Sequence, residues 1–392
     1  MFARSIALAA VAGSLAFATP ASAQSNGETP TTTVSRSSDF ARFEPQPTGI
    51  STTIDYSFLD EALQYMVLRM GPSTRQGMGK PAPGMGTRRL YGHESRVRLE
   101  GNRIVFSFLD EDAIAPLTEY RKELEQLGTD LPISSLPKSE QLAYWMNLHN
   151  VSVIEQIALN YPLQSPSRMK LGAGRTPLDE TPFITVDGVA MSPKDIRTKI
   201  VFPNWDDANV IYGFFRGEIG GPSIQRRAFN GQNLDELLGI AATEFVNSLR
   251  GVEGFGRTLL VSAIYEEAAP YYFPQMGDDL KAHLNRNAGE EVKALVARKD
   301  SIEINQYEDT VADLAAGDRE PSYSYIEQDG IAQRTRISPS VARLLGERYE
   351  KYEKLRREGL LRGRVIVLPP TTSERAQELE ETAEPETEPQ GI

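Results

Sequence analysis

Three polar side chains interrupt the longest apolar helical stretch of the chain, which runs from Glu140 to Asn160. Asn147, His149 and Asn150 lie where helical periodicity otherwise places apolar residues. A polar group buried without a hydrogen-bond partner destabilises a protein by roughly 1–3 kcal/mol. The two amides therefore either bridge backbone groups of packed segments or line a binding cleft. His149 is either a hydrogen-bonded structural residue or a general base, and a base needs its proton donor within hydrogen-bond reach.

A glycine-rich turn at 216–223, with the sequence Arg-Gly-Glu-Ile-Gly-Gly-Pro-Ser, is the second candidate site. Successive glycines can turn backbone N–H groups towards an anion, but the spacing matches neither a P-loop nor a dinucleotide fingerprint. A purely structural turn is therefore the alternative. Arg216 and Glu218 either pair with each other or hold a ligand. Ser223 lacks both the strand–turn–helix setting of a nucleophilic serine and an identifiable base.

Two adjacent carboxylate pairs, Glu266–Glu267 and Asp278–Asp279, have the residue types that glycoside hydrolysis uses. On an acidic protein such pairs are far more often solvated surface groups, which is the interpretation favoured here. The formal net charge is −12, and no concentrated basic face is apparent. The composition therefore argues against nucleic acid or an anionic membrane as the main partner.

Cysteine and histidine usage restricts the chemistry further. The chain contains no cysteine, which excludes thiolate mechanisms, disulfides and Cys-ligated metals. Its three histidines, His93, His149 and His283, are far apart in sequence and do not form a ligand pair on one helical turn. We therefore expect neither a metal centre nor another cofactor.

Hydrophobic periodicity predicts the elements that position these groups. Helices are expected over residues 56–70, 112–127, 140–160, 193–201, 234–249, 259–273, 278–284 and 338–359. Strands are expected over 209–215, 301–307 and 364–370, with hairpins at 95–108 and 183–191. The predicted fold is α+β, with a buried central helix at 140–160 packed on a small, mainly antiparallel sheet. A C-terminal helix-plus-strand extension packs on this domain.

The two ends of the chain have signals of their own. Arg4, an apolar core at 6–17 and the small residues Ala21-Ser-Ala23 are typical of a secretory signal cleaved after Ala23. No apolar run is long enough to span a bilayer, so we expect a soluble protein that is periplasmic or secreted. Residues 24–50 are expected to be a disordered linker, and the Glu-rich segment 371–392 a disordered tail.

The segment 71–86 is rich in glycine, methionine and proline, and is expected to be a mobile loop. The basic residues in and after it are Arg75, Lys80, Arg88 and Arg89. They either contact an anionic partner or are simply solvated, and the second interpretation is favoured.

The stretch Gln-Leu-Ala-Tyr-Trp-Met-Asn-Leu-His-Asn at 141–150 resembles the family catalogued as domain of unknown function 547, whose members carry Ala-Phe-Trp-Ile-Asn-Leu-Tyr-Asn. Segments at 186–196, 210–224 and 307–311 are similar to further family motifs, so the resemblance extends over about 54–314. It implies one domain at 51–314, followed by a C-terminal extension at 315–370.

This chain departs from the family where the family has reactive side chains. Arg216 and Gly221 stand where relatives carry two cysteines, and Ile196-Arg197-Thr198 replaces their Ile-Glu-His. If those Cys and His residues form a thiol site in relatives, the resemblance implies a degenerate member or one with altered chemistry.

Two hypotheses of function follow. The first is a non-catalytic periplasmic protein that binds a small molecule or an envelope protein between the 140–160 helix and the 216–223 turn, through the five residues Asn147, His149, Asn150, Arg216 and Glu218. The alternative is a hydrolase or acyl-transfer enzyme acting on cell-envelope material. The alternative requires two of His149, Glu218 and Ser223 to lie within about 3–4 Å of each other or of a shared water.

Overall fold

The computed structural model describes residues 38–46, 51–81, 92–318 and 338–360, all of which lie in one compact unit. Helices dominate it and the strands are short, which confirms the α+β class. The expected signal peptide, the strand at 364–370 and the acidic tail lie outside the described residues. Within the described part of the chain, no helix is both long and apolar enough to cross a membrane.

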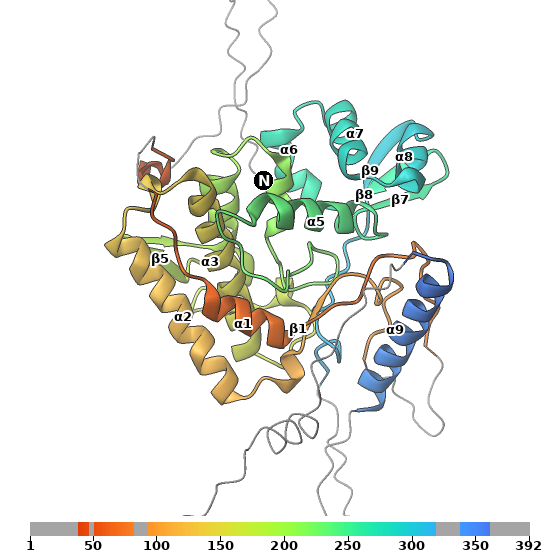
Figure 1. Ribbon diagram of the computed structural model, residues 1–392, viewed down its shortest axis with the longest axis horizontal. Helices are drawn as coiled ribbons and strands as arrows, with labels where there is room; N and C mark the ends of the chain where they lie inside the picture. The colour runs from red at the N-terminus through yellow and green to blue at the C-terminus, as the bar shows by residue number, and fades with distance from the viewer. Residues whose placement is uncertain (1–37, 47–50, 82–91, 319–337, 361–392) are drawn as a thin grey trace, which may run out of the picture. The chain divides into compact units, whose positions relative to one another are not determined.

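Helix α3 (Lys138–Leu159) confirms the predicted central helix, and nearly all of its side chains are buried. Because it is apolar on most of its circumference, it must be surrounded by other elements. Its main neighbours are α2 (Glu111–Asp130), α4 (Pro193–Asp195) and the π-helical turn η6 (Ile196–Val201), as Figure 1 shows for α2. The strands form four small separate sheets, three of them two-stranded and antiparallel, and the main neighbours of α3 are helices and turns.

The contact between α2 and α3 depends on one glycine. A side chain at Gly128 would overlap the Tyr144 hydroxyl, which donates a hydrogen bond to the Leu124 carbonyl oxygen at 2.8 Å. Asp110 is the N-cap of α2, and its carboxylate accepts a hydrogen bond from the N–H of Ala113. Helix α2 confirms the prediction at 112–127.

The N-terminal segment corrects one expectation. Residues Ser38–Phe43 form the 3₁₀ helix η1, and Phe40 and Phe43 are buried in the core, with the Phe43 ring 5.1 Å from that of Trp145. The predicted linker at 24–50 is therefore not disordered over its described part. Two large aromatic side chains bury enough apolar surface to hold this short segment in place.

Several local signals are confirmed. Helix α1 (Ser57–Met66) occupies the first predicted helix and leads into β1 (Val67–Leu68), which pairs with β2 (Arg103–Ile104). The hairpin β5 (Ile184–Val186) and β6 (Val189–Met191) turns at Asp187 and Gly188, both with positive φ. Ser192 then forms a capping box with Asp195. The remaining small hairpin comprises β3 (Lys170–Leu171) and β4 (Thr176–Pro177).

Two predicted β segments are wrong. Residues 209–215 lie in a 3₁₀ helix, η7 (Ala208–Gly213), and an irregular segment that packs on α5 (Leu234–Val246). Their aromatic and β-branched side chains are almost all buried instead of alternating between two faces. Composition favoured a strand, but complete burial within a helical core decided the conformation.

The predicted hairpin at 95–108 is a series of turns around a buried cation. The guanidinium of Arg103 is fully buried and donates to the backbone carbonyls of four residues, Arg98, Glu100, Gly101 and Asn102. The chain curls around this group because a buried charge needs its hydrogen bonds satisfied. Only β2 remains of the expected strands.

A three-stranded sheet contains β7 (Val252–Phe255), β8 (Thr258–Val261) and β9 (Ser301–Ile304). The strands β7 and β8 are antiparallel, whereas β8 and β9 are parallel. Strand β9 was predicted, but the expected helix at 259–273 begins only after β8. The helices beside this sheet are α6 (Ile264–Tyr272), α7 (Met276–Asn287) and α8 (Glu290–Ala297).

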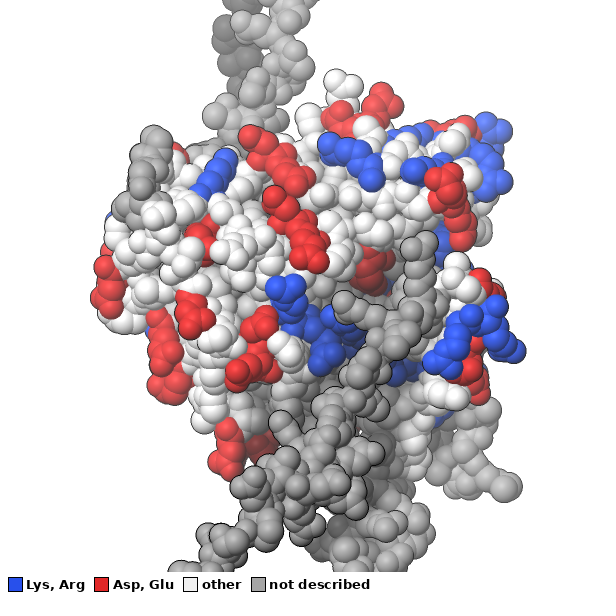
Figure 2. Space-filling view, in the orientation of Figure 1, with Lys and Arg blue, Asp and Glu red and all other residues white. Residues whose placement is uncertain are grey.

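Helix α9 (Pro339–Arg357) confirms the predicted C-terminal helix, with Ser338 as its N-cap. It packs on residues 70–71 and 93–99, where Lys351 Nζ donates to the carbonyl oxygens of Met70 and Leu99 and Arg343 donates to that of His93. Residues 71–81 of the expected mobile loop also pack on the fold, since Arg75 donates to the carbonyls of Ser248 and Val252. On the face shown in Figure 2, acidic side chains lie along α2, and both signs occur over α8 and α9.

Candidate functional site

Asn147 and Asn150 are buried and hydrogen-bonded to backbone. The Asn147 amide donates to the carbonyl of Phe229 at 2.7 Å and accepts from its N–H at 3.0 Å. Asn150 donates to the Gly213 carbonyl and accepts from the Phe215 N–H, both at 2.9 Å. Each side chain makes the pair of backbone hydrogen bonds that a neighbouring strand would otherwise make with an irregular segment. Both amides therefore lie in the core and not in a cleft.

His149 begins a buried chain of polar groups. Its Nδ1 lies 3.0 Å from Asn150 Oδ1, and its Nε2 lies 2.9 Å from Nη1 of Arg197. Because a guanidinium can only donate, Nε2 accepts and the proton resides on Nδ1. Burial, reinforced by the charge of Arg197, lowers the pKa of His149 to about 3. The imidazole is therefore neutral, and its lone pair is already occupied.

Arg197 connects this histidine to two carboxylates. Its guanidinium is fully buried and binds Asp179 at 2.7 and 2.6 Å and Glu267 at 2.9 and 3.0 Å. Glu267 also pairs with Arg216, at 2.7 Å. Burial disfavours the charged form of Glu267, but Arg216 and Arg197 lower its pKa to about 2. We call Asp179, Arg197, Arg216 and Glu267 the arginine cluster; its two positive and two negative charges balance.

A cavity of about 260 Å³ lies beside the arginine cluster, between α3, the turn at 216–218 and the start of α6. Its apolar wall includes Val153, Pro166, Leu178 and Ile264. Its polar residues are Ser167, Asp179, Arg216, Glu218 and Tyr307. We call it the Glu218 cavity. The predicted turn and the predicted helix therefore do border a common pocket, although at Val153 and not at Asn147 or Asn150.

Glu218 is the least compensated charge in this cavity. It is 3% exposed and accepts a hydrogen bond from the N–H of Ser167 to Oε1 at 2.7 Å, and the hydroxyls of Ser167 and Tyr307 also lie beside its carboxylate. No Lys or Arg of the described residues forms an ion pair with it. Burial raises the pKa of Glu218 to about 7. Perturbed carboxyl groups that line clefts are candidates for functional residues.

Tyr307 closes the cavity from a segment far away in the sequence. Its hydroxyl is buried beside the Glu218 carboxylate, and burial together with that negative charge holds the pKa of Tyr307 well above its usual range. The segment is held against the turn by backbone bonds from Gly220 N to the Glu308 carbonyl and from Ile219 N to the Thr310 carbonyl, each 2.8 Å. A side chain at Gly220 would meet the Glu308 backbone at 2.7 Å, so this close approach explains the glycine.

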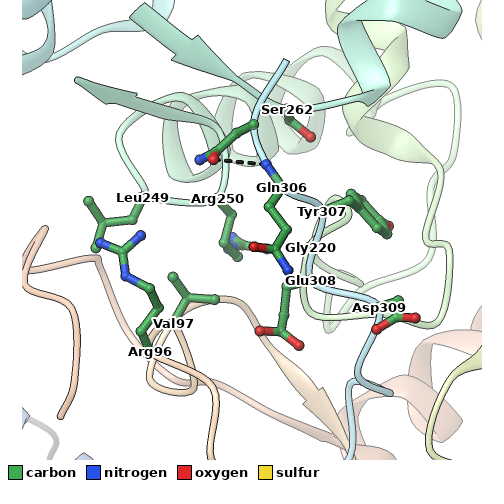
Figure 3. A pocket seen from close by; sticks show the side chains of 11 residues that line it. Arg96, Val97, Gly220, Leu249, Arg250, Ser262, Gln306, Tyr307, Glu308 and Asp309 are labelled. Atoms are coloured by element: carbon green, nitrogen blue, oxygen red, sulfur yellow. Dashed lines mark hydrogen bonds between the residues drawn. The ribbon is translucent and has the colours of Figure 1, made fainter. Parts of the chain in front are cut away.

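A second cavity, of about 210 Å³, also borders Tyr307 and is more polar (Figure 3). In Figure 3, Arg96 and Val97 face the segment that carries Gln306 and Glu308. Arg96 is engaged by Glu253 in a bidentate pair, with both distances 2.7 Å. The positive charge that Arg96 brings to this second cavity is therefore already neutralised by Glu253.

Ser223 belongs to a different network. Its hydroxyl donates to Glu244 at 2.9 Å and accepts from the N–H of Asn102 at 3.2 Å. His149 instead bonds Asn150 and Arg197, and Glu218 bonds Ser167. The enzyme hypothesis requires at least two of these three residues to lie close together. None of them hydrogen-bonds to another.

The remaining candidates are distributed as follows. Glu266 is exposed, whereas its neighbour Glu267 is part of the arginine cluster. Asp279 accepts from the N–H of Gln275 at the start of α7, which is a structural role. Lys80 is exposed, and Arg88 and Arg89 lie outside the described residues. In the described part, no group of His, Asp and Glu is arranged to hold a metal ion.

Sequence reasoning missed Asp179, Glu267 as a cluster member, and Tyr307. No local signal distinguishes Asp179 from other surface acids. A signal did exist for Arg197 and Arg216, because both are charged residues where the resembled family has Glu and Cys. A Cβ atom on Gly221 would lie 3.4 Å from that of Arg216. The two positions that hold cysteine in the family are therefore close to disulfide separation in this fold.

Comparison with known protein families finds a match over part of the chain. Residues 133–246 match the family model described as "Protein of unknown function, DUF547". No curated protein and no solved structure matches the chain. The matched region contains α3, Arg197 and the 216–223 turn, but is narrower than the expected 54–314 and excludes Tyr307. Over residues 133–246, the chain is therefore similar to the family of unknown function DUF547.

Proposed function

We propose that this protein is exported and binds a small molecule in the Glu218 cavity without transforming it. The observation that carries the proposal is a mainly apolar cavity that contains the buried carboxyl of Glu218, which no Lys or Arg of the described residues pairs with, and the hydroxyl of Tyr307 beside it. Ligand sites are typically apolar concavities with a few convergent polar groups.

Binding without catalysis is favoured by the state of the neighbouring groups. The lone pair of His149 is occupied by Arg197, and the guanidinium groups of the arginine cluster are held by its two carboxylates. The alternative, a hydrolase or acyl-transfer enzyme acting on cell-envelope material, gains no support from Ser223. Its hydroxyl donates to Glu244, a carboxylate that is already paired with Arg250, and it contacts neither His149 nor Glu218.

A fragment screen tests the proposal with a cavity-filling variant. Ala263 lines the cavity, so Ala263→Leu should occupy part of its volume. The exposed Ala294 on α8 supplies the matched control Ala294→Leu. Ligand-observed NMR should find fragments that bind wild type and Ala294→Leu but lose affinity for Ala263→Leu. If no fragment distinguishes the two variants, the cavity is not a binding site.

Export rests on the signal-like sequence at 1–23 and has a separate test. Expression with the native N-terminus, followed by fractionation and intact-mass measurement, should yield a periplasmic or secreted protein that begins at Gln24. Recovery of the uncleaved chain in the cytoplasm would refute export without affecting the cavity.

A further inference from the structure

We propose that the ligand of the Glu218 cavity is a small amphipathic amine, whose protonated amino group pairs with Glu218 and whose hydrocarbon part fills the apolar end. This inference rests on the proposed function and specifies its ligand class. Three properties of the site support it: the charge count, the distribution of polar groups and the cavity volume.

The charge count leaves one negative charge without a partner. The arginine cluster is balanced, and His149 is neutral. Of the elements packed around Glu218, the 3₁₀ helix η4 (Pro166–Arg168) supplies Arg168, but this cation pairs with Asp309 at 2.8 Å. The segment after β9 contributes Tyr307 and Asp309, neither of which is a cation. An ionised Glu218 therefore gives the site a net charge of −1, which a ligand of charge +1 neutralises.

The polar groups that line the Glu218 cavity suit a ligand that donates hydrogen bonds more than one that accepts them. Glu218 can accept at its second oxygen, and the buried Tyr307 hydroxyl can accept at its lone pairs. An ammonium group, which has only donors, can use both. A carboxylate or phosphate would face two carboxylates, Glu218 and Asp179. Arg216 retains an Nε–H without a partner among the described residues, but its charge is already neutralised by Glu267.

The cavity volume limits the size of the ligand. At about 260 Å³ it lies just below the usual range for drug-sized ligands, roughly 300–1,000 Å³. The wall formed by Val153, Pro166, Leu178 and Ile264 offers only apolar contact. A compact aliphatic or alicyclic amine fits both properties.

Amine binding must also depend on pH. The ammonium group needs Glu218 ionised, and burial raises the pKa of this carboxyl to about 7 in the free protein. Below that pH an amine can bind only by displacing the proton, so its affinity falls. Between pH 7.5 and pH 6.0 the ionised fraction, and with it the affinity, should drop about eightfold.

The experiment compares three probes of one shape, cyclohexylmethylamine, cyclohexylmethanol and cyclohexanecarboxylate, by NMR titration of the full-length protein at pH 7.5. The amine should bind at least about tenfold more tightly than the alcohol, since a desolvated charge pair contributes 1.4 kcal/mol or more. The carboxylate should bind most weakly. Glu218→Gln should reduce amine affinity to that of the alcohol and abolish its pH dependence, whereas the exposed-site control Glu266→Gln should change neither.

The outcomes separate this inference from the proposed function. If amine and alcohol bind equally, or if Glu218→Gln leaves amine affinity unchanged, the ligand class is wrong but the cavity remains a binding site. If the carboxylate binds most tightly, the charge argument is wrong. If none of the three probes binds, and the fragment screen also fails, the proposed function is itself refuted.

Discussion

Replacing Glu218 by Gln should stabilise the protein at pH 8 and leave its stability at pH 4.5 nearly unchanged. Glu218 is almost fully buried, and its pKa is raised from 4.5 to about 7 because burial disfavours the carboxylate. Each pKa unit corresponds to 1.36 kcal/mol, so ionising this group in the folded protein lowers the free energy of unfolding by about 3 kcal/mol. Glutamine resembles the protonated carboxyl and avoids this loss.

The sign of this pH dependence of stability follows from the pKa values of Glu218 in the folded and unfolded protein. The folded pKa lies above the unfolded one, so the stabilising contribution is complete below about pH 4.5. It is lost progressively as pH rises to about 7, and beyond that pH the loss is constant. The advantage of Glu218→Gln should therefore grow between pH 4.5 and pH 7 and then level off.

Urea unfolding from pH 4.5 to pH 8 measures this difference for wild type, Glu218→Gln and the control Glu266→Gln. Other titrating groups, including His93 and His149, whose pKa values are lowered to about 3, contribute equally to wild type and variant and cancel in the difference. A difference that stays constant over the whole range would refute the assignment of Glu218 as a buried, uncompensated carboxyl.

Three further predictions concern the surroundings of the cavity. Arg197→Met should lower the free energy of unfolding by about 3 kcal/mol in urea titrations, because two carboxylates lose their buried partner; the exposed control Lys194→Met should change it by less than about 0.5 kcal/mol. Asn150→Ala should lower it by about 2–4 kcal/mol, since one buried carbonyl and one buried N–H lose their partner, and a change below about 1 kcal/mol would contradict this bridging role. The double variant of Arg216→Cys and Gly221→Cys should form an internal disulfide under oxidising conditions, shown by thiol alkylation and mass measurement; persistent free thiols would show that the two β-carbons do not approach as closely as the fold indicates.

The candidate site was only partly predictable. The sequence indicated that the 216–223 turn and the 140–160 helix share a pocket, and both border the Glu218 cavity. It also singled out Glu218 and Arg216, which line it. Asn147 and Asn150 were noticed for a sound reason, their polar groups on an apolar helix, but sequence could not tell a bridge to backbone from a ligand contact. That distinction depends on where Phe229 and Gly213 lie in space.

Two β predictions failed for a related reason. Residues 209–215 have the composition of a strand, yet Asn150 and α5 provide their packing and hydrogen bonds. Residues 95–108 alternate between polar and apolar, yet Arg103 draws the carbonyls of this segment around its buried guanidinium. In both cases a tertiary partner competes successfully with the local preference, because satisfying buried polar groups outweighs strand propensity.

The sequence by itself determined what depends on neighbours along the chain. Helical periodicity defined α3, the Asp187–Gly188 turn defined a hairpin, and Ser192 and Ser338 marked the starts of α4 and α9, since capping and turn geometry involve only a few consecutive residues. Tertiary structure alone decided the site. Arg197 meets Glu267, 70 residues away in sequence, and Tyr307 closes the cavity beside Glu218. These contacts form only when the core folds, because burial in a low-dielectric interior is what makes the pairing of such distant charges decisive.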